Sequence, residues 1–396
     1  MNRREFLVAL AAATAGCGGF SESMSCERVG GRDDTNVGSS VGRVRDATGR
    51  WPAAYGPFDG TRAVRDGRYT GTVRRGWRQT SVDFDTDCDP VLANETLYLV
   101  DDDGCVVALD ATDGTVQWCD DTVNTEQSVV AGPDQLYLRD GGTLVAFDPQ
   151  RREVIWRCEF GSGRTLSTPV TDGERLFVHV QGSEERLVAV RGGAPLWSVP
   201  ASSAPVVANG RLFVLHYATL RAVDPETGEE IWQQSLGSAD FDTLSVREGQ
   251  VYLTGSGLTA VDTESGDSNW SRNVPPGRTV RAAVAPERVY VPTRRLAAAP
   301  PRLYTYRRET AERISCRRPA SFVSGPVVTT DELLIFVGGF DPEAEASTVF
   351  VQAQRHTGGT EWRVTRQPQS TVLSLCAGRE ALFFRHSSTV EAFVFE

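Results

Sequence analysis

One phrase recurs about every 40 residues along the chain, and it limits the possible folds more than any other feature. The phrase runs from a stretch rich in aliphatic and aromatic residues through a turn, Ala-x-Asp and a Thr-Gly turn to a Trp. Its clearest copies are LYLVDDDGCVVALDATDGTVQW (97–118), LYLRDGGTLVAFDPQRREVIW (136–156), LFVLHYATLRAVDPETGEEIW (212–232) and VYLTGSGLTAVDTESGDSNW (251–270). Such a period is typical of folds in which copies of one small unit pack side by side.

Each copy predicts short strands joined by tight turns. Runs of alternating or clustered apolar residues between turn residues are typical of strands. In four copies an Asp lies eight residues before the Trp, at Asp110, Asp148, Asp224 and Asp262. We expect these side chains to accept backbone N–H groups of the turn, in which a Gly takes positive φ. The Trp that ends each copy would pack against the neighbouring copy.

Two series of positions count the units. The Trp series comprises Trp77, Trp118, Trp156, Trp197, Trp232, Trp270 and Trp362, with its missing member at Ser315. The Ala series comprises Ala108, Ala146, Ala189, Ala222, Ala260, Ala353 and Ala392, with Thr305 in the empty place. Both series therefore have eight members. Trp77 precedes the first complete unit and the last unit ends without a Trp, so a strand around Trp77 completes the last unit. We predict an all-β, eight-bladed β-propeller of four-stranded antiparallel blades over residues 51–396, whose last blade is closed by an N-terminal strand.

These residues resemble the quinoprotein-type (PQQ-like) propeller repeat, whose blades carry the same Ala-x-Asp, Thr-Gly and Trp signature. The stretch Trp51-Pro52 through Tyr55-Gly56 to Thr61 is similar to the lead-in segment that precedes the first blade in this family. The resemblance covers residues 51–396. For function it implies two classes, because the repeat serves pyrroloquinoline-quinone (PQQ) dehydrogenases and also non-catalytic propellers, including the lipoprotein scaffold of outer-membrane protein assembly.

The dehydrogenase class matches the sequence poorly. There the resemblance implies a disulfide between adjacent cysteines over the quinone, a Ca²⁺ held by carboxylate and amide oxygens, and an Asp base. No two cysteines are adjacent in this chain, and no C-x-x-C-H haem site occurs. The run Asp101-Asp102-Asp103-Gly104 is interpreted as a hairpin turn, because it lacks the spaced ligands of a Ca²⁺ loop. We therefore expect no catalytic residue, no metal and no cofactor, with PQQ and Ca²⁺ as the alternative.

Histidines and cysteines give no metal pattern. His179, His216, His356 and His386 lie on separate repeats without a Cys or His partner at metal spacing, so we interpret them as structural. Besides Cys17, seven cysteines remain: Cys26, Cys88, Cys105, Cys119, Cys158, Cys316 and Cys376. An odd number in an exported protein leaves at least one free or intermolecular, and the pairing stays open. Three of them follow Trp positions by one or two residues and are expected on outer strands: Cys119, Cys158 and Cys316.

One segment departs from the acidic character of the chain, whose net charge is −11. Between Arg288 and Arg318 nine Arg accompany two Glu, in the unit that lost its Trp. This unit carries an insertion at 292–302 and the next unit one at 338–347, both expected between second and third strands and hence on one face. The functional hypothesis is a docking site for an anionic or protein partner, with Arg294, Arg295, Arg307 and Arg308 as contacts. The alternative is a diverged blade with solvated arginines.

The first residues have the features of an export signal. Arg3 and Arg4 followed by a short apolar run resemble a twin-arginine signal, and the run is too short to span a bilayer. Thr14-Ala15-Gly16-Cys17 resembles a lipobox, so residues 1–17 are predicted to be a signal with lipid attachment at Cys17; the alternative is cleavage elsewhere. Residues 18–50 contain 7 Gly and 5 Ser but no Leu or Ile, which predicts a flexible tether.

The lack of Lys and the net negative charge indicate the habitat of the protein and restrict its possible partners. No Lys occurs, so all 41 basic residues are Arg, and an acidic, Lys-free surface resembles that of exported lipoproteins of haloarchaeal type. A net-acidic surface repels phosphates, so nucleic acid is not expected as a partner. The prediction is a monomeric, non-catalytic binding or assembly scaffold, lipid-anchored to the outer face of the cytoplasmic membrane, with envelope proteins or an anionic ligand as partners. The alternatives are a PQQ-dependent dehydrogenase with a diverged site and a carbohydrate-binding propeller.

Overall fold

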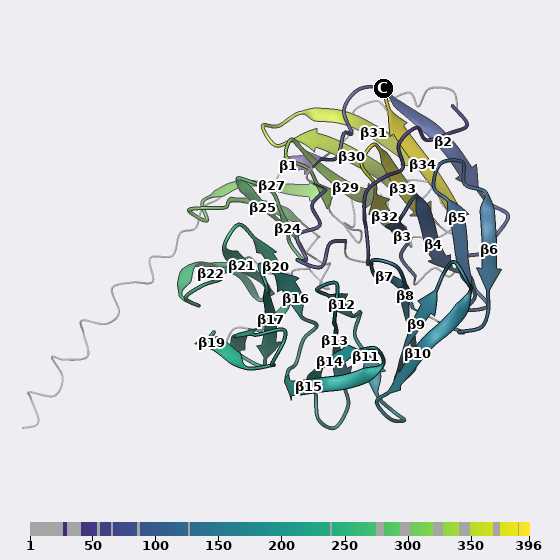
Figure 1. Cartoon of the computed structure of the whole chain (residues 1–396). Coiled ribbons are helices and arrows are strands. Elements are labelled where there is room, and N and C mark those ends of the chain that lie inside the picture. The colour runs from purple at the N-terminus through teal and green to yellow at the C-terminus, as the bar shows by residue number, and fades with distance from the viewer. Residues whose placement is uncertain are drawn as a thin grey trace, which may run out of the picture.

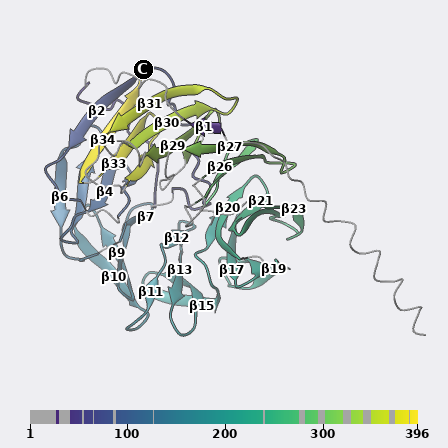
Figure 2. The same ribbon diagram turned by 180° about the vertical axis from the view of Figure 1, so that it is seen from behind.

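A computed structural model shows eight β-sheets arranged in a ring around a central axis (Figures 1 and 2). The structure describes residues 27–29 and 41–396, except 54–55, 65, 85–87, 126, 238–239, 275–280, 294–301, 320–327, 340–348, 367–372 and 387. Within these ranges no helix is long and apolar enough to cross a membrane. The signal residues Arg3 and Arg4 and the lipobox Cys17 lie outside the described residues.

The first four blades follow one another in chain order. In each of them the first strand is the innermost of the ring and the last strand lies at the rim. Blade 1 contains β3 (Val91–Ala93), β4 (Thr96–Val100), β5 (Val106–Asp110) and β6 (Val116–Asp120). Blade 2 contains β7 (Val130–Ala131), β8 (Leu136–Asp140), β9 (Thr143–Asp148) and β10 (Glu153–Glu159). Blade 3 has a divided inner strand and contains β11 (Thr165–Leu166), β12 (Val170–Thr171), β13 (Leu176–Gln181), β14 (Arg186–Arg191) and β15 (Ala194–Pro200). Blade 4 contains β16 (Val206–Ala208), β17 (Arg211–His216), β18 (Thr219–Val223) and β19 (Glu230–Ser235).

The other four blades complete the ring. Blade 5 contains β20 (Phe241–Arg247), β21 (Gln250–Gly255), β22 (Gly257–Asp262) and β23 (Ser268–Asn273). Blade 6 contains β24 (Ala283–Val284), β25 (Arg288–Pro292), β26 (Leu303–Arg307) and β27 (Arg313–Pro319). Blade 7 contains β28 (Val328–Thr329), β29 (Leu333–Gly339), β30 (Val349–Arg355) and β31 (Thr360–Arg366). Blade 8 contains β32 (Leu373–Ala377), β33 (Ala381–His386), β34 (Thr389–Phe395) and the N-terminal strand β2 (Val73–Gln79).

The predicted closure of the last blade is confirmed. Strand β2, which carries Trp77, pairs antiparallel with β34 from the other end of the chain. The side chain of Glu391 on β34 is 3% exposed and ties this blade to its surroundings. Its carboxylate lies 2.7 Å from Arg366 Nε of blade 7, 3.4 Å from His386 Nε2, and 3.8 and 3.9 Å from Arg75 and Arg78 of β2. Ion pairs of Glu391 and the pairing of β2 with β34 therefore both stabilise the place where the ring closes.

The register confirms the two series of positions. In six blades the Ala of the repeat pairs across the two outer strands with the Trp of the same unit, as Ala108 does with Trp118 and Ala353 with Trp362. In blade 8 both Ala392 and Trp77 lie within a register shift between β2 and β34. The diverged unit keeps the pairing, because Thr305 lies opposite Ser315. A small residue opposite the Trp leaves room for the indole on the sheet. The signature is thus a packing rule within each blade.

The Trp side chains also fasten one blade to the next. Five indole N–H groups donate to carbonyl oxygens of the following blade: Trp77 to Ala111, Trp197 to Glu226, Trp232 to Thr263, Trp270 to Arg308 and Trp362 to Tyr69. The glycine of the Thr-Gly turn lies under the indole. Gly228 has φ +76°, and a Cβ there would lie 2.7 Å from the Trp197 ring. The Asp of the signature caps this turn as predicted, since Asp224 Oδ1 accepts the N–H groups of Glu226 and Thr227.

Blade 6, which lacks the Trp, uses a different contact to blade 7. The Tyr290 hydroxyl lies 2.5 Å from Nδ1 of His356, and the two rings stack with centroids 5.5 Å apart. His356 Nε2 lies 3.0 Å from the carbonyl oxygen of Thr330. The outer edge of blade 6 is also the edge that a further strand covers, because β1 (Glu27–Val29) pairs in parallel with β27. The diverged blade therefore holds its neighbour through a polar pair.

Part of the predicted tether is packed. In the segment 41–50, Val44 is 1% exposed and Ala47 is fully buried within the core that blade 8 shares with blade 1. The N–H of Val44 donates to the carbonyl oxygen of Thr112. Within the segment predicted as a tether, Val44 and Ala47 therefore contact the core, while most of residues 41–50 are exposed. The lack of Leu and Ile gave no indication of this contact.

Candidate functional site

The segment from Trp51 to Val64, of which the structure describes all residues but 54–55, lies against the inner strands of the ring. It forms backbone hydrogen bonds with the innermost strands of five blades. The pairs are Trp51 with Leu92 of β3, Pro52 with Ala131 of β7, Phe58 with Val207 of β16, Asp59 with Val246 of β20, and Thr61 with Val284 of β24. The lead-in predicted from the sequence is therefore part of the ring.

Local sequence shapes this segment. The carboxylate of Asp59 accepts the backbone N–H and the hydroxyl of Thr61, at 2.9 and 2.7 Å, which forms a tight turn. Gly60 within the turn has φ +71°, and a Cβ there would lie 2.6 Å from the Leu244 carbonyl oxygen. Only glycine allows so close an approach to the backbone of blade 5. The fully buried Trp51 anchors the start of the segment.

A charged cluster lies deep in the ring beside this segment. Asp89 precedes β3, Arg62 follows the lead-in turn, and Arg385 of β33 donates from Nε to Ser374 Oγ at 3.0 Å. Burial raises the pKa of the Asp89 carboxyl above its ordinary value, while the charges of Arg385 and Arg62 and a hydrogen bond with Ser374 lower it. Arg62 is 7% and Arg385 1% exposed. This cluster could not be predicted from the sequence, because its members are far apart in the chain and belong to no motif.

The donor set of this cluster does not fit the calcium-quinone pair of the dehydrogenase alternative. A Ca²⁺ site needs several oxygen ligands, whereas Asp89 is one carboxylate between two guanidinium groups that would repel the cation. We therefore derive no chemistry through a quinone or a metal at this place.

The structure describes two of the four predicted arginine contacts, Arg307 and Arg308. Arg294 and Arg295 lie outside the described residues, in the connection between β25 and β26. Arg307 is at the other end of β26, half-exposed and 3.1 Å from Glu312. Arg308 is mostly buried, with Nη2 2.7 Å from Glu248 and Nε donating to the Pro286 carbonyl. Both insertions do connect second and third strands, as predicted, but Arg307 and Arg308 belong to the opposite face.

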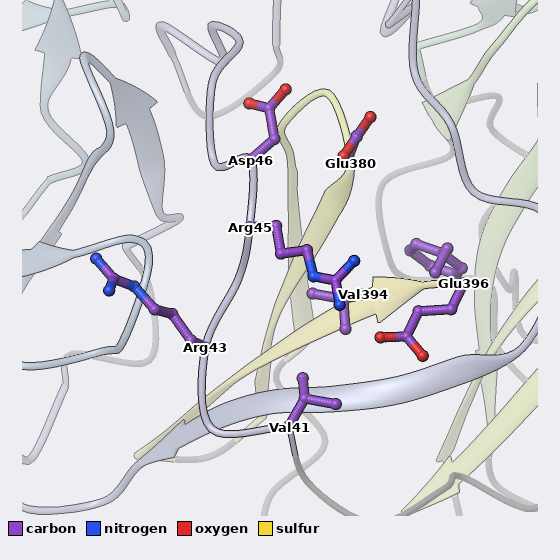
Figure 3. A pocket seen from close by; sticks show the side chains of 8 residues that line it. Val41, Arg43, Arg45, Asp46, Glu380, Val394 and Glu396 are labelled. Atoms are coloured by element: carbon purple, nitrogen blue, oxygen red, sulfur yellow. The ribbon is translucent and has the colours of Figure 1, made fainter.

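A cavity of about 600 Å³ opens between the segment 41–46 and blade 8 (Figure 3). Its wall carries charges of both signs, from Arg43, Arg45 and Asp46 on one side and Glu380 and Glu396 on the other. Val394 and Phe395 supply the apolar part of the wall. Such a wall suits a peptide segment or another ligand that carries both charges. The sequence analysis missed it because it assigned Arg43 and Arg45 to the tether.

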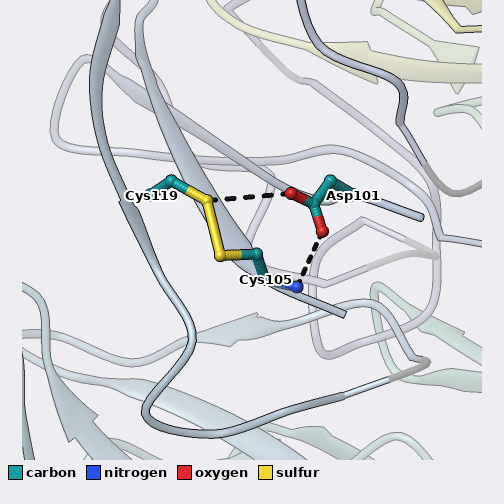
Figure 4. Close-up of side chains that lie close together, drawn as sticks. All are labelled: Asp101, Cys105 and Cys119. Atoms are coloured by element: carbon teal, nitrogen blue, oxygen red, sulfur yellow. Dashed lines mark hydrogen bonds between the residues drawn. A yellow bond between two sulfur atoms is a disulfide. The ribbon is translucent and has the colours of Figure 1, made fainter. Parts of the chain in front are cut away.

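A second polar group lies at the rim of blade 1 (Figure 4). Cys105 and Cys119 are joined by a disulfide, and the carboxylate of Asp101 lies beside it. Asp101–Gly104 forms the hairpin turn between β4 and β5, as the sequence predicted. Cys316 is also in a disulfide, whereas Cys158 and Cys376 are buried free thiols, and Cys88 is buried as well. Cys119, Cys158 and Cys316 lie on outermost strands as expected.

The four histidines remain apart, on blades 3, 4, 7 and 8. His179 is 1% exposed and lies 3.2 Å from Glu185, and the His216 ring contacts the Tyr217 ring at a tilt of 50°. His356 and His386 hold the contacts to Tyr290 and Glu391 described above. Among the described residues these histidines form no common site.

Comparison with known proteins agrees with the fold and the repeat. A family model described as outer membrane protein assembly factor BamB matches residues 67–150 and 181–389. Curated relatives include the outer membrane protein assembly factor BamB of Yersinia pestis, 26% identical over 244 residues that cover 52% of this chain and 58% of that protein. The BamB of Escherichia coli K12 is 28% identical over 120 residues, covering 28% of this chain and 29% of that protein. The chain thus matches less than two thirds of the length of these relatives.

Solved structures share the architecture at low identity. BamB from Moraxella catarrhalis superposes with a TM-score of 0.60 and 15% identity, covering 82% of this chain and 99% of that chain. Quinohemoprotein alcohol dehydrogenase from Comamonas testosteroni superposes with a TM-score of 0.68 and 12% identity, covering 88% of this chain and 81% of that chain. At these identities both show the fold alone. Because the family model matches more than half of the residues, the chain belongs to the family of outer membrane protein assembly factor BamB, with PQQ-like repeats in an eight-bladed propeller.

Proposed function

We propose that this protein is a non-catalytic scaffold that binds other envelope proteins, is exported through a twin-arginine signal, and is tethered by lipid at Cys17 to the outer face of the cytoplasmic membrane. The observation that carries the proposal is the lead-in segment, which forms backbone hydrogen bonds with the inner strands of five blades and so covers them. The charged cluster beside it offers one carboxylate and two guanidinium groups, a set that does not suit Ca²⁺. Membership in a family named for assembly supports the same reading.

The docking surface that fits this role best is the cavity between residues 41–46 and blade 8. Its charges of both signs and its apolar floor suit a peptide segment of a partner protein. The half-exposed Arg307 and the mostly paired Arg308 offer less, since each already has an acidic partner. Docking through Arg294 and Arg295 remains part of the proposal for the other face.

Titration calorimetry of the full mature chain with PQQ, with and without Ca²⁺ at high salt, tests the non-catalytic part. No heat is expected in either condition. Micromolar, Ca²⁺-dependent binding would refute it and restore the dehydrogenase alternative. Retention on a polysaccharide column would instead favour the carbohydrate-binding alternative.

Detergent phase partition tests the anchor separately. The full chain should enter the detergent phase and Cys17→Ser should remain in the aqueous phase, because a lipid chain carries the affinity for detergent. Equal partition of both would exclude lipidation at Cys17. It would not affect the scaffold proposal, which the calorimetry tests separately.

A further inference from the structure

The disulfide at the rim of blade 1 lies beside a carboxylate to which it cannot donate a hydrogen bond. Asp101 Oδ2 lies 3.7 Å from Cys119 Sγ (Figure 4). A disulfide sulfur carries no hydrogen and cannot donate to a carboxylate. In the thiol form the same sulfur either donates to this oxygen or, as a thiolate, shares a cation with it. The arrangement therefore gains an interaction only when the disulfide is reduced.

The carboxylate is fixed by the backbone and does not depend on the disulfide. Its other oxygen, Oδ1, accepts the N–H groups of Cys105 and Asp103 at 2.8 and 3.1 Å. The turn itself is clamped from outside, because Thr125 N–H donates to the Gly104 carbonyl and the side-chain amide of Asn124 donates to the Asp103 carbonyl. Gly104 has φ +82°, and a Cβ there would meet the Asn124 amide at 2.5 Å. The turn stays in place when the sulfur–sulfur bond opens.

The strand pair β5–β6 positions Cys119, and Cys105 directly precedes β5. Val107 pairs with Cys119 and Val106 with Asp120 in the antiparallel β5–β6 ladder. One ligand atom from each of Asp101, Cys105 and Cys119 lies within 4.8 Å of the others. Cys119 is exposed, so water reaches a fourth position. Asp102 and Asp103 on the adjoining turn are exposed as well and favour the approach of a cation.

We propose that reduction of the Cys105–Cys119 disulfide creates a site for a soft divalent cation such as Zn²⁺, held by the two thiolates and Asp101 Oδ2 with one position open to water. Two thiolates with one carboxylate and a water are a ligand set that Zn²⁺ accepts in tetrahedral geometry. The reductant is an external dithiol: it gives two electrons and two protons to the disulfide, which becomes two thiols, and itself becomes a disulfide. Binding of the cation then releases the two thiol protons. Reoxidation expels the metal, so the site is loaded only under reducing conditions.

The test uses Co²⁺, whose thiolate complexes absorb in the near ultraviolet, as a spectroscopic stand-in for Zn²⁺. The full chain is reduced, freed of reductant under argon and titrated, beside an unreduced sample. The reduced protein should bind one Co²⁺ with thiolate absorption that Zn²⁺ displaces, and the unreduced protein should show none. Asp101→Asn should weaken binding by at least about tenfold, and Cys119→Ser should abolish the thiolate band. Cys158→Ser, which removes a buried free thiol elsewhere, is the matched control and should bind like the wild type.

A second readout does not depend on absorption. Zn²⁺ should slow alkylation of Cys105 and Cys119 in the reduced chain, measured by peptide mass spectrometry, and leave alkylation of Cys158 unchanged. A reduced wild type without the cobalt–thiolate band would overturn the proposal. So would a band that persists in Cys119→Ser, or an Asp101→Asn variant that binds as tightly as the wild type.

Discussion

Glu391 at the closing seam offers the sharpest test of how the ring is held. The substitution Glu391→Gln keeps the size and the acceptor oxygen but removes the charge that faces Arg366, His386 and two arginines of β2. Burial alone would raise the pKa of Glu391. Hydrogen bonds from His386 and Arg366 and the charge of Arg366 outweigh burial and lower the pKa from its ordinary 4.5 to about 2.

The magnitude follows from that difference. One pKa unit corresponds to about 1.4 kcal/mol, so the ionised Glu391 contributes roughly 3 kcal/mol to the free energy of unfolding at neutral pH. Because the folded-state pKa is the lower one, this contribution is complete above about pH 5. It is lost as the pH falls from 4.5 toward 2. Glu391→Gln should therefore lose roughly 3 kcal/mol at pH 7 and approach the wild type below pH 2.5.

Denaturant unfolding followed by tryptophan fluorescence, at several pH values, measures this difference. Glu380→Gln is the matched control on the same blade, because the Glu380 side chain is 34% exposed and its partner Arg68 69%. An exposed pair contributes at most about 1 kcal/mol, so this variant should stay close to the wild type. A Glu391→Gln variant that loses less than 1 kcal/mol, or whose loss does not change between pH 7 and pH 3, would refute the reasoning.

The remaining predictions concern the blade contacts and pH. Gly228→Ala should destabilise the protein by about 1–3 kcal/mol more than Gly210→Ala, since both have positive φ but only a Cβ at 228 meets an indole; equal losses in denaturant unfolding would contradict the packing. Trp232→Phe removes the indole N–H that donates to the Thr263 carbonyl, so it should lower the free energy of unfolding by about 1 kcal/mol beyond the loss of buried ring area; a loss that the area alone explains would contradict a role for this hydrogen bond. Burial lowers the pKa of His179 and His356 below 6.5, so the unfolded chain binds more protons and stability should fall as the pH drops below about 6.5. Replacing both with Gln should remove that decline in thermal scans from pH 7.5 to 5.5, and an unchanged decline would assign it to other groups.

The sequence predicted the ring because its repeat is also its packing rule. The Trp, the Ala opposite it and the turn glycine recur in the chain and in space, so even Ser315 and Thr305 could be placed. The sites were harder to predict. Asp89 and Arg385 are almost 300 residues apart in the chain and meet only because the ring closes. The Cys105–Cys119 pairing and the docking of Val44 likewise depend on tertiary neighbours that no local pattern encodes.

The composite last blade has a consequence for biosynthesis. Strands β2 and β34 are about 310 residues apart, so the partner of β2 leaves the ribosome roughly 15–60 s after β2 at ordinary rates of translation. During that time β2 has an unpaired edge and the nascent ring stays open. Seven blades can form in order of synthesis, but the closing step involves the most distant contacts in the chain and is expected to be the slowest. A chain of this kind benefits from staying among chaperones until the ring has closed, because the open edge of β2 could otherwise pair with another chain.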